Sequence, residues 1–103
     1  MSTKEEVMQA LDEVEDPELK LSIVELGLVY DVRFELKEGL QHAEIDMTLT
    51  SPGCPAAAEI MAATHRAALN AVESVHINLV WSPRWDPKVH ANEDARMDMG
   101  IWD

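Results

Sequence analysis

The sequence has one cysteine, so an internal disulfide framework is excluded, and this suits a reducing compartment. Basic residues are also scarce, with 8 Lys and Arg against 20 Asp and Glu, which gives a formal net charge of −12. An acidic surface repels phosphate backbones and argues against nucleic acid as a partner. A basic protein surface or a metal ion suits this charge better, although solubility alone is a sufficient reason for it.

Long apolar runs are absent too. No stretch approaches the roughly 20 apolar residues that a bilayer-spanning helix needs. The N-terminal stretch, MSTKEEVMQALDEVEDPE, is acidic and lacks the apolar block of a signal peptide. We therefore expect a cytoplasmic protein with no membrane partner. With 103 residues, 47% of them hydrophobic, we expect residues 1–103 to form a single globular domain.

The N-terminal quarter is predicted to be helical. Residues 3–14 carry one apolar stripe, and either Thr3 with Glu6 or Ser2 with Glu5 has the spacing of a capping box. Asp16-Pro17 is expected to end this helix, because the residue before a proline avoids helical geometry. Residues 22–27, SIVELG, predict a short helical turn that Gly27 closes.

Two alternating segments follow and predict a hairpin that turns at residues 37–41. Residues 28–36 form the first strand. The apolar residues expected to face inward from it are Leu28, Tyr30, Val32, Phe34 and Leu36. Those expected to face inward from the second strand are Ala43, Ile45, Met47 and Leu49.

Residues 55–72 are rich in alanine and predict a helix that covers the apolar face of the hairpin, with Pro55 at the first helical position. Its inward side should contain Ile60, Thr64, Ala67, Ala68 and Ala71. Residues 75–81 predict a third strand, parallel to the second because of the helical crossover. The expected fold class is α+β: a small mixed three-stranded sheet covered by helices, in the order helix, short helix, strand, strand, helix, strand.

The tail, residues 83–103, is expected to be an extended C-terminal strap or arm. Its aromatic residues, Trp85 and Trp102, either pack over the domain edge or anchor a partner. Asn92 is predicted to cap a final helical turn that ends at Gly100.

The cysteine lies in TLTSPGCP, residues 48–55. The turn at Pro52-Gly53 is expected to hold Cys54 at the start of the alanine-rich helix, where unpaired N–H groups favour a thiolate. Thiolate is the form that binds metal or attacks sulfur. The hydroxyls of Thr50 and Ser51 are candidate donors to a sulfide or phosphate-like ligand. The alternative is that Cys54 is a small buried hydrophobe.

One thiolate cannot complete the ligand set of a zinc ion or an iron–sulfur cluster. Further ligands would come from a second subunit, a small thiol or a client, so any cluster would be held transiently. The histidines show no ligand spacing and are expected at the surface, and they are His42, His65, His76 and His90. Asp16 and Glu18 of the DPE stretch offer two carboxylates. No Ser–His–Asp signature, phosphate-binding glycine loop or Cys-x-x-Cys is present, so we do not expect an enzyme.

Three stretches together resemble a known family: DPELKLSIVELGLVYDV at residues 16–32, TLTSPGCP at 48–55, and WSPRWDP at 81–87. They resemble the metal–sulfur cluster biosynthesis family, once catalogued as a domain of unknown function, which includes PaaD-like and SufT-like iron–sulfur assembly factors. The resemblance extends from about residue 5 to residue 100. Two departures stand out: Lys20 stands where the family often has proline, and the stretch from Pro87 to Ala95 is about one residue longer.

The resemblance implies a compact α+β fold and a role in maturing iron–sulfur proteins. Cys54 matches the cysteine of the family's SPGCP motif and would contact a transient cluster, with Thr50, Ser51 and Gly53 in the loop that presents it. Asp16 and Glu18 match the DPE motif and Glu25 the ELG motif, as residues at the edge of the site. Scaffold or client proteins are the implied partners, and a homo-oligomer would supply a second thiol. Two alternatives remain: an adaptor that binds no metal, or an accessory subunit of a multicomponent oxygenase pathway.

Overall fold

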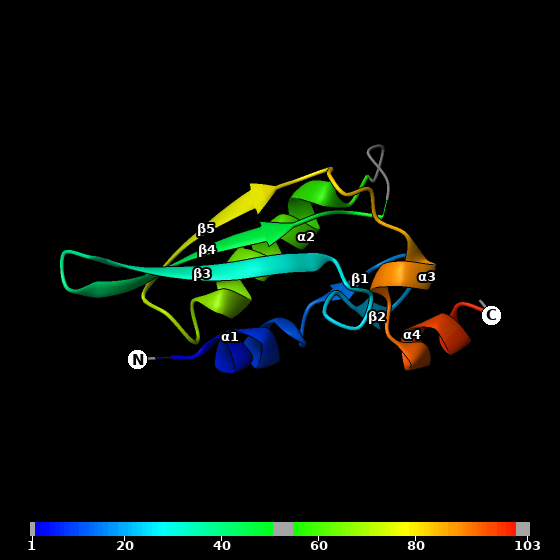
Figure 1. The fold of residues 1–103 in the computed structure, drawn as a ribbon, viewed down its shortest axis with the longest axis horizontal. Helices are drawn as coiled ribbons and strands as arrows, with labels where there is room; N and C mark the ends of the chain where they lie inside the picture. The colour runs from blue at the N-terminus through cyan, green and yellow to red at the C-terminus, as the bar shows by residue number, and fades with distance from the viewer. Residues whose placement is uncertain (1, 51–54, 101–103) are drawn as a thin grey trace.

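A mixed three-stranded sheet forms the centre of the molecule, in a computed structural model that describes residues 2–50 and 55–100. The strands are β3 (Val29–Lys37), β4 (Leu40–Met47) and β5 (Ser74–Leu79), in the order β3-β4-β5. Helix α2 (Ala57–Ala68) covers one face of this sheet, and α1 (Lys4–Leu11) lies beside α2 and β3 (Figure 1). The predicted α+β class and the order of its main elements are confirmed.

The central strand β4 makes the sheet mixed, because it pairs antiparallel with β3 and parallel with β5. The prediction of a parallel third strand is therefore confirmed. The inward residues predicted for the second strand are all buried, and they are Ala43, Ile45, Met47 and Leu49. The alternation of apolar and polar residues thus predicted the buried face of β4 correctly, as expected for a sheet with one covered face.

The alanine-rich helix also presents the predicted side to the sheet. Ile60, Thr64, Ala67 and Ala68 are buried, and Ala71 is half-buried just after the helix ends. The prediction for Pro55 is wrong, since α2 begins at Ala57 and Ala56 is its N-cap. The first helical hydrogen bond runs from the Ile60 N–H to the Ala56 carbonyl, so Pro55 belongs to the preceding turn.

Helix α1 begins as predicted and ends early. Thr3 and Glu6 form the capping box, which decides between the two alternatives. The helix ends at Leu11 rather than at Asp16-Pro17, because the chain there enters a small hairpin that the sequence did not predict. In it, β1 (Glu15–Asp16) pairs antiparallel with β2 (Leu21–Ser22).

Residues 23–28 form the single helical turn that was predicted around Gly27, without a regular helix. The Leu28 N–H donates to the Ile23 carbonyl, and the Gly27 N–H donates to the Val24 carbonyl. Together with φ +75° at Gly27, these bonds are those of a Schellman motif. Ile23 and Leu28, its hydrophobic pair, are both buried. At the start of the turn, the Ser22 hydroxyl accepts from the Val24 N–H.

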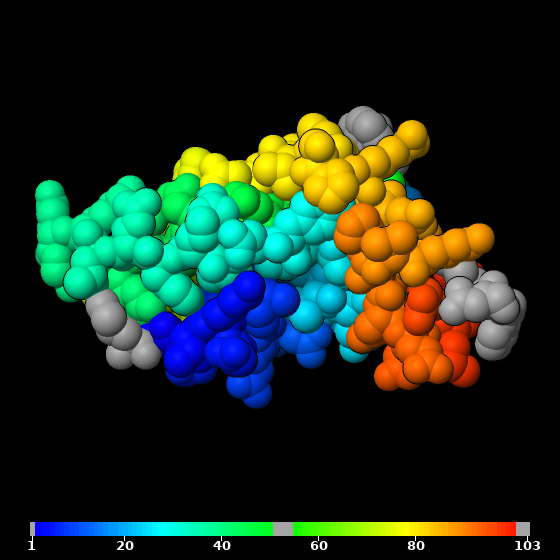
Figure 2. All heavy atoms as spheres, in the orientation of Figure 1, coloured from blue at the N-terminus to red at the C-terminus, as the bar shows by residue number. Residues whose placement is uncertain are grey.

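The far half of the β3–β4 hairpin extends beyond the helices, as Figures 1 and 2 show at the end away from the strap. There the prediction of inward-facing residues on the first strand is wrong. Phe34 is 37% exposed and Leu36 is 65% exposed. The same alternation that fills the core at Leu28 and Val32 continues past the edge of the core. The pairing with β4 is regular from Asp31 to Lys37, so exposure begins at Phe34 without a break in register.

The described part of the tail, residues 83–100, is called the strap below. It contains two short helices, α3 (Pro87–His90) and α4 (Glu93–Asp98), so it is not extended throughout. Asn92 is the N-cap of α4, as predicted, and its side chain accepts from the Ala95 N–H. Figure 1 shows α3 and α4 at the end of the sheet opposite the hairpin turn. Within residues 2–50 and 55–100, no helix has the length and apolar character that crossing a bilayer requires.

Candidate functional site

The aspartate of the DPE stretch has a structural role. Asp16 is 1% exposed, and its Oδ1 accepts from the N–H groups of Glu18 (2.8 Å) and Leu19 (3.1 Å). Its carbonyl accepts from the Lys20 N–H. A buried carboxylate held in this way shapes the turn between β1 and β2. The side chain of Glu18, by contrast, is exposed and has no hydrogen-bond partner among the described residues.

Lys20 completes that turn in a left-handed conformation, with φ +57°. Proline cannot adopt this conformation, because its ring holds φ near −65°. A chain with proline at position 20, as the family often has, therefore could not form this turn in the same conformation.

The ELG stretch serves as the anchor of the strap. The Glu25 carbonyl accepts from the Asn92 N–H at 2.8 Å, and the Leu26 carbonyl accepts from the Trp85 indole N–H at 2.7 Å. At Gly27 an added Cβ would lie 2.0 Å from the carbonyl oxygen of His90. The strap thus fits against this turn only because residue 27 has no side chain.

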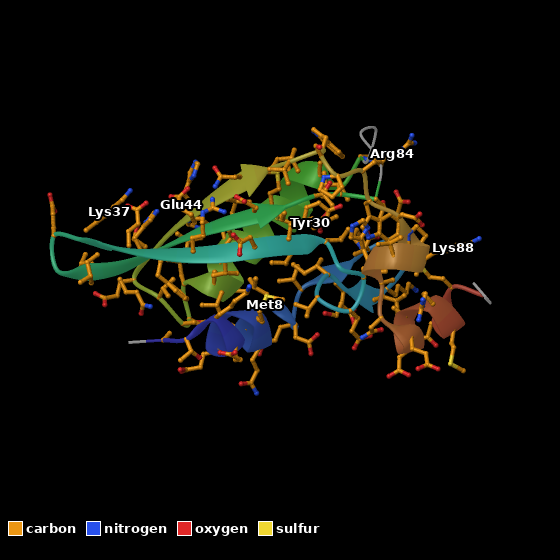
Figure 3. The ribbon with its side chains drawn as sticks, viewed as in Figure 1. Met8, Tyr30, Lys37, Glu44, Arg84 and Lys88 are labelled. Carbon is orange, nitrogen blue, oxygen red and sulfur yellow. The ribbon has the colours of Figure 1, made fainter. Side chains whose placement is uncertain are left out.

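The side chain of Glu25 points to a different place. It lines a shallow hollow of about 480 Å³ between α1 and the turn, together with Met8 and Val24. Figure 3 labels Met8 on α1 at this side of the molecule. Among the described residues, no hydrogen bond or ion pair joins Glu25 to Asp16 or Glu18. The structure therefore does not bring the ELG and DPE carboxylates together.

The strap is held further by Tyr30, which Figure 3 shows at the end of β3 nearest the strap. Its hydroxyl donates to the Pro83 carbonyl at 2.9 Å, and its ring stacks on His90 with centroids 5.1 Å apart. Partial burial raises the pKa of Tyr30. His90, expected at the surface, is half-buried in this contact.

Residues 50–55, called the cysteine corner here, come between β4 and α2 in the sequence. Thr50 is half-buried at its near side, whereas Ser51, Gly53 and Cys54 lie outside the described residues. Their proposed roles therefore remain predictions. Thr48, two residues before Thr50, is fully buried, and its hydroxyl oxygen has no hydrogen-bond partner in the described structure.

Across residues 2–50 and 55–100, no group of three or more His, Cys, Asp or Glu side chains could hold a metal ion. The described residues therefore do not form a binding site for a resident metal.

The outer face of the sheet carries a polar network that the sequence did not reveal. His42 was expected at the surface and is 5% exposed, because its ring is held between Ser74 (Nδ1 to Oγ, 2.8 Å) and Glu44 (Nε2 to Oε2, 2.5 Å). His76 and Asn78 contact the other oxygen of the same carboxylate. Hydrogen bonds from His42, Asn78 and His76 lower the pKa of Glu44 to about 2.

Next to this network, Arg33 bridges two carboxylates. It pairs with Asp46 through two hydrogen bonds, at 2.6 and 3.0 Å, and with Asp31 at 3.1 Å. These bonds lower the pKa of Asp46 and of Asp31 and raise that of Arg33. His76 remains exposed on this face and His65 on α2, as predicted.

A second feature missed from the sequence is a groove between the segment that follows α1 and helix α2. It encloses about 350 Å³ and includes Pro17 of the DPE stretch, as well as Glu59 in the first turn of α2. The DPE segment therefore lies against the helix that follows the cysteine corner. The lining residues come from segments more than forty positions apart, so no local sequence pattern could have found them.

The chain is similar to curated proteins over nearly its whole length. It is 48% identical over 100 residues to the Fe-S protein maturation auxiliary factor YitW of Bacillus subtilis, which covers 95% of this chain and 94% of that protein. It is 45% identical over 88 residues to the auxiliary factor SufT of Staphylococcus aureus, which covers 84% of this chain and 96% of that protein. An auxiliary factor of Porphyromonas gingivalis is 32% identical over 103 residues, with 98% of this chain and 94% of that protein covered.

Solved structures agree with this. A domain of unknown function from Bacillus anthracis has a TM-score of 0.84 and 34% identity, and covers 96% of this chain and 92% of its own. A conserved hypothetical protein from Thermotoga maritima has a TM-score of 0.78 and 35% identity, with 96% and 95% covered. The sequence model described as iron–sulfur cluster assembly protein matches residues 4–78. By its sequence and its fold, the chain belongs to this iron–sulfur cluster assembly family.

Proposed function

We propose that this chain is an auxiliary factor that helps client proteins to acquire their iron–sulfur clusters, and that it does so in the cytoplasm without being an enzyme. The observation that carries the proposal is its 48% identity, over 95% of the chain, to a relative named as an Fe-S protein maturation auxiliary factor. The names of the relatives from Staphylococcus aureus and Porphyromonas gingivalis support the same role.

In the proposed mechanism, the Cys54 thiolate contacts a cluster that is in transit between a scaffold and a client. A single thiolate leaves the other iron sites to ligands from outside the chain. Transient contact also suits the described residues, which offer no metal-binding group of their own. A second copy of the chain is one source of a further thiol, and a homo-oligomer would then form around the cluster.

Anaerobic reconstitution with iron and sulfide tests this mechanism. The wild-type chain should develop charge-transfer absorbance, and Cys54→Ser should lose it while keeping its circular dichroism spectrum. Light scattering on the reconstituted sample should show whether cluster formation goes with dimerisation. Equal spectra for the two proteins would show that Cys54 does not contact the cluster.

An adaptor is the second candidate, because the chain is strongly acidic and offers its charge to a basic protein surface. In that role the protein bridges the assembly machinery and a client without touching the cluster. The Cys54→Ser variant separates the two mechanisms in cells that lack the wild-type chain. Full recovery of iron–sulfur enzyme activity by this variant would support the adaptor.

A further inference from the structure

The groove between the 13–17 segment and α2, called the acidic groove below, has an apolar floor. Val14, Ile60, Ala63 and Ala67 form the floor, and each is a core residue or packs directly against the core. Three of the four come from one face of α2. A floor that is part of the core is fixed in place, and its alanines leave room for side chains of a partner.

The rim of the groove carries charged side chains that have no partner of their own. Glu13 and Glu15 lie on one side, and Glu59 and Arg66 lie on α2. All four are exposed, and none makes a hydrogen bond or an ion pair within the described residues. In contrast, Asp31 and Asp46 on the sheet each form an ion pair with Arg33. Three carboxylates against one guanidinium leave the rim negative.

The acidic groove continues along α1. A neighbouring hollow of about 370 Å³ shares Glu13 and Asn70 with it and is lined further by Glu6 and Ala10 of α1 and by Ala71. The shared residues make the two hollows one track along the outer side of the helices. A partner segment that spans both hollows would contact them with several residues rather than with one side chain.

We propose that the acidic groove is the docking site for a basic amphipathic segment of a partner protein. Apolar side chains of that segment would contact the floor, and Lys or Arg side chains would pair with the carboxylates of the rim. The long aliphatic parts of Lys and Arg also suit an apolar floor with charged edges. A second copy of the chain is a poor occupant, because its net charge of −12 opposes contact with a negative rim.

This inference rests on the proposed function, since it describes how a scaffold or client would be held. The DPE segment forms one wall of the groove, and the wall opposite begins at the helix that follows the cysteine corner. A partner segment bound there would lie beside the first turns of α2, the helix that follows Cys54 in the sequence. The groove would thus align donor or recipient without contributing a ligand to the cluster.

Fluorescence anisotropy with a labelled amphipathic peptide of lysine and leucine tests the surface directly. Glu13→Lys/Glu15→Lys should weaken binding of this peptide by about tenfold at physiological salt. The control, Glu35→Lys/Glu38→Lys on the hairpin, changes the net charge equally and should alter binding by less than about twofold. An equal loss in both variants would mean that only the overall charge attracts the peptide, and the proposal would be overturned.

A matched pair on α2 tests the floor. Ala63→Phe fills the groove, whereas Ala62→Phe places the same side chain on the adjacent exposed position. Only the first should weaken peptide binding, and thermal melts should show that both variants are folded. The remaining alternative is that a second copy of the chain occupies the groove, which light scattering tests. If the wild-type chain is a dimer and Glu13→Lys/Glu15→Lys dissociates it, the groove serves self-association and the proposal is overturned.

Activities of iron–sulfur enzymes in cells separate this inference from the proposed function. If deletion of the chain leaves those activities unchanged, the proposed function fails, whatever the groove binds. If deletion lowers them and the wild-type gene restores them, the Glu13→Lys/Glu15→Lys variant should restore them poorly and the hairpin control fully. Full restoration by the groove variant would overturn the inference and leave the function intact.

Discussion

The two ends of the sheet use similar alternating sequences in different ways. At the end near the strap, Leu28 and Val32 are buried beneath several chain segments. At the hairpin end, Phe34 and Leu36 continue the alternation of the same strand into solvent. Figure 3 shows the contrast between Tyr30, beside the strap, and Lys37, on the projecting hairpin. Burial on this strand is therefore decided by what covers it, not by its own pattern.

The end near the strap is held by backbone contacts between distant segments. The turn at residues 23–28, the β1–β2 hairpin and the strap meet there, and the resembling stretches DPE and ELG are both part of this assembly. Several residues that carry the resemblance to the family thus have a structural role. In this protein, residues of the DPE and ELG motifs therefore form close contacts within the fold, and a match to a family motif does not by itself indicate a catalytic or binding role.

The largest expected effect is at Gly27. Gly27→Ala would place its Cβ against the His90 carbonyl at φ +75°, so we expect a loss of about 3 kcal/mol in unfolding free energy, measured by urea denaturation. Gly39→Ala at the hairpin has φ +81° but no atom within 4 Å of the added Cβ, and should cost about 1 kcal/mol. Equal losses of unfolding free energy in the two variants would show that the contact with His90 does not make the strap end more sensitive than the hairpin end.

Asp16 comes next. Asp16→Ala removes the acceptor of two N–H groups in the β1–β2 turn and should lower the unfolding free energy by about 1 to 2 kcal/mol in the same assay. Asp16→Asn retains a carbonyl oxygen in that position and should lose less than about 1 kcal/mol. A stable Asp16→Asn variant that fails to support iron–sulfur enzyme activity would show that the carboxylate has a second role at the site.

The smallest effect concerns Glu44, midway along the sheet toward the hairpin (Figure 3). Its pKa is lowered from 4.5 to about 2, so its charged form stabilises the fold above about pH 4.5, and this contribution is lost as the pH falls toward 2. Glu44→Gln should therefore reduce the fall in melting temperature between these pH values. Glu38→Gln, at the hairpin turn, removes the same charge from a side chain that has no hydrogen-bond partner among the described residues. Identical pH profiles for wild type and Glu44→Gln would show that the network does not hold this half of the sheet.

Periodicity predicted the faces of β4 and α2 because the residues that it assigned to the core, from Ala43 onward in β4 and from Ile60 to Ala68 in α2, lie where the sheet and the helix cover each other. It failed at Phe34 and Leu36 because a local pattern does not say how far the helices reach. The β1–β2 hairpin escaped prediction because each strand has two residues, too short for any period to be recognised. His42 was misplaced since its burial depends on Ser74, a residue on a neighbouring strand.

The candidate site was likewise predictable only in part from the sequence. Local sequence was enough to single out Asp16 and Glu25, but not to show that one shapes a turn and the other offers its carbonyl to the strap. The acidic groove could not be predicted, because Glu15 and Arg66 become neighbours only through the packing of α2. For Cys54, Ser51 and Gly53 the assignments still rest on the resemblance and on the position before α2.

The strap determines where this protein can be truncated without loss of its internal hydrogen bonds. The matched family segment stops at residue 78, yet the Leu26 and Glu25 carbonyls inside it bond to Trp85 and Asn92 outside it. A fragment that ends at residue 78 would lack the donors that complete its own turn. The cooperative folding unit is thus longer than the segment that the family model matches, and any chimera or minimal version should include the strap.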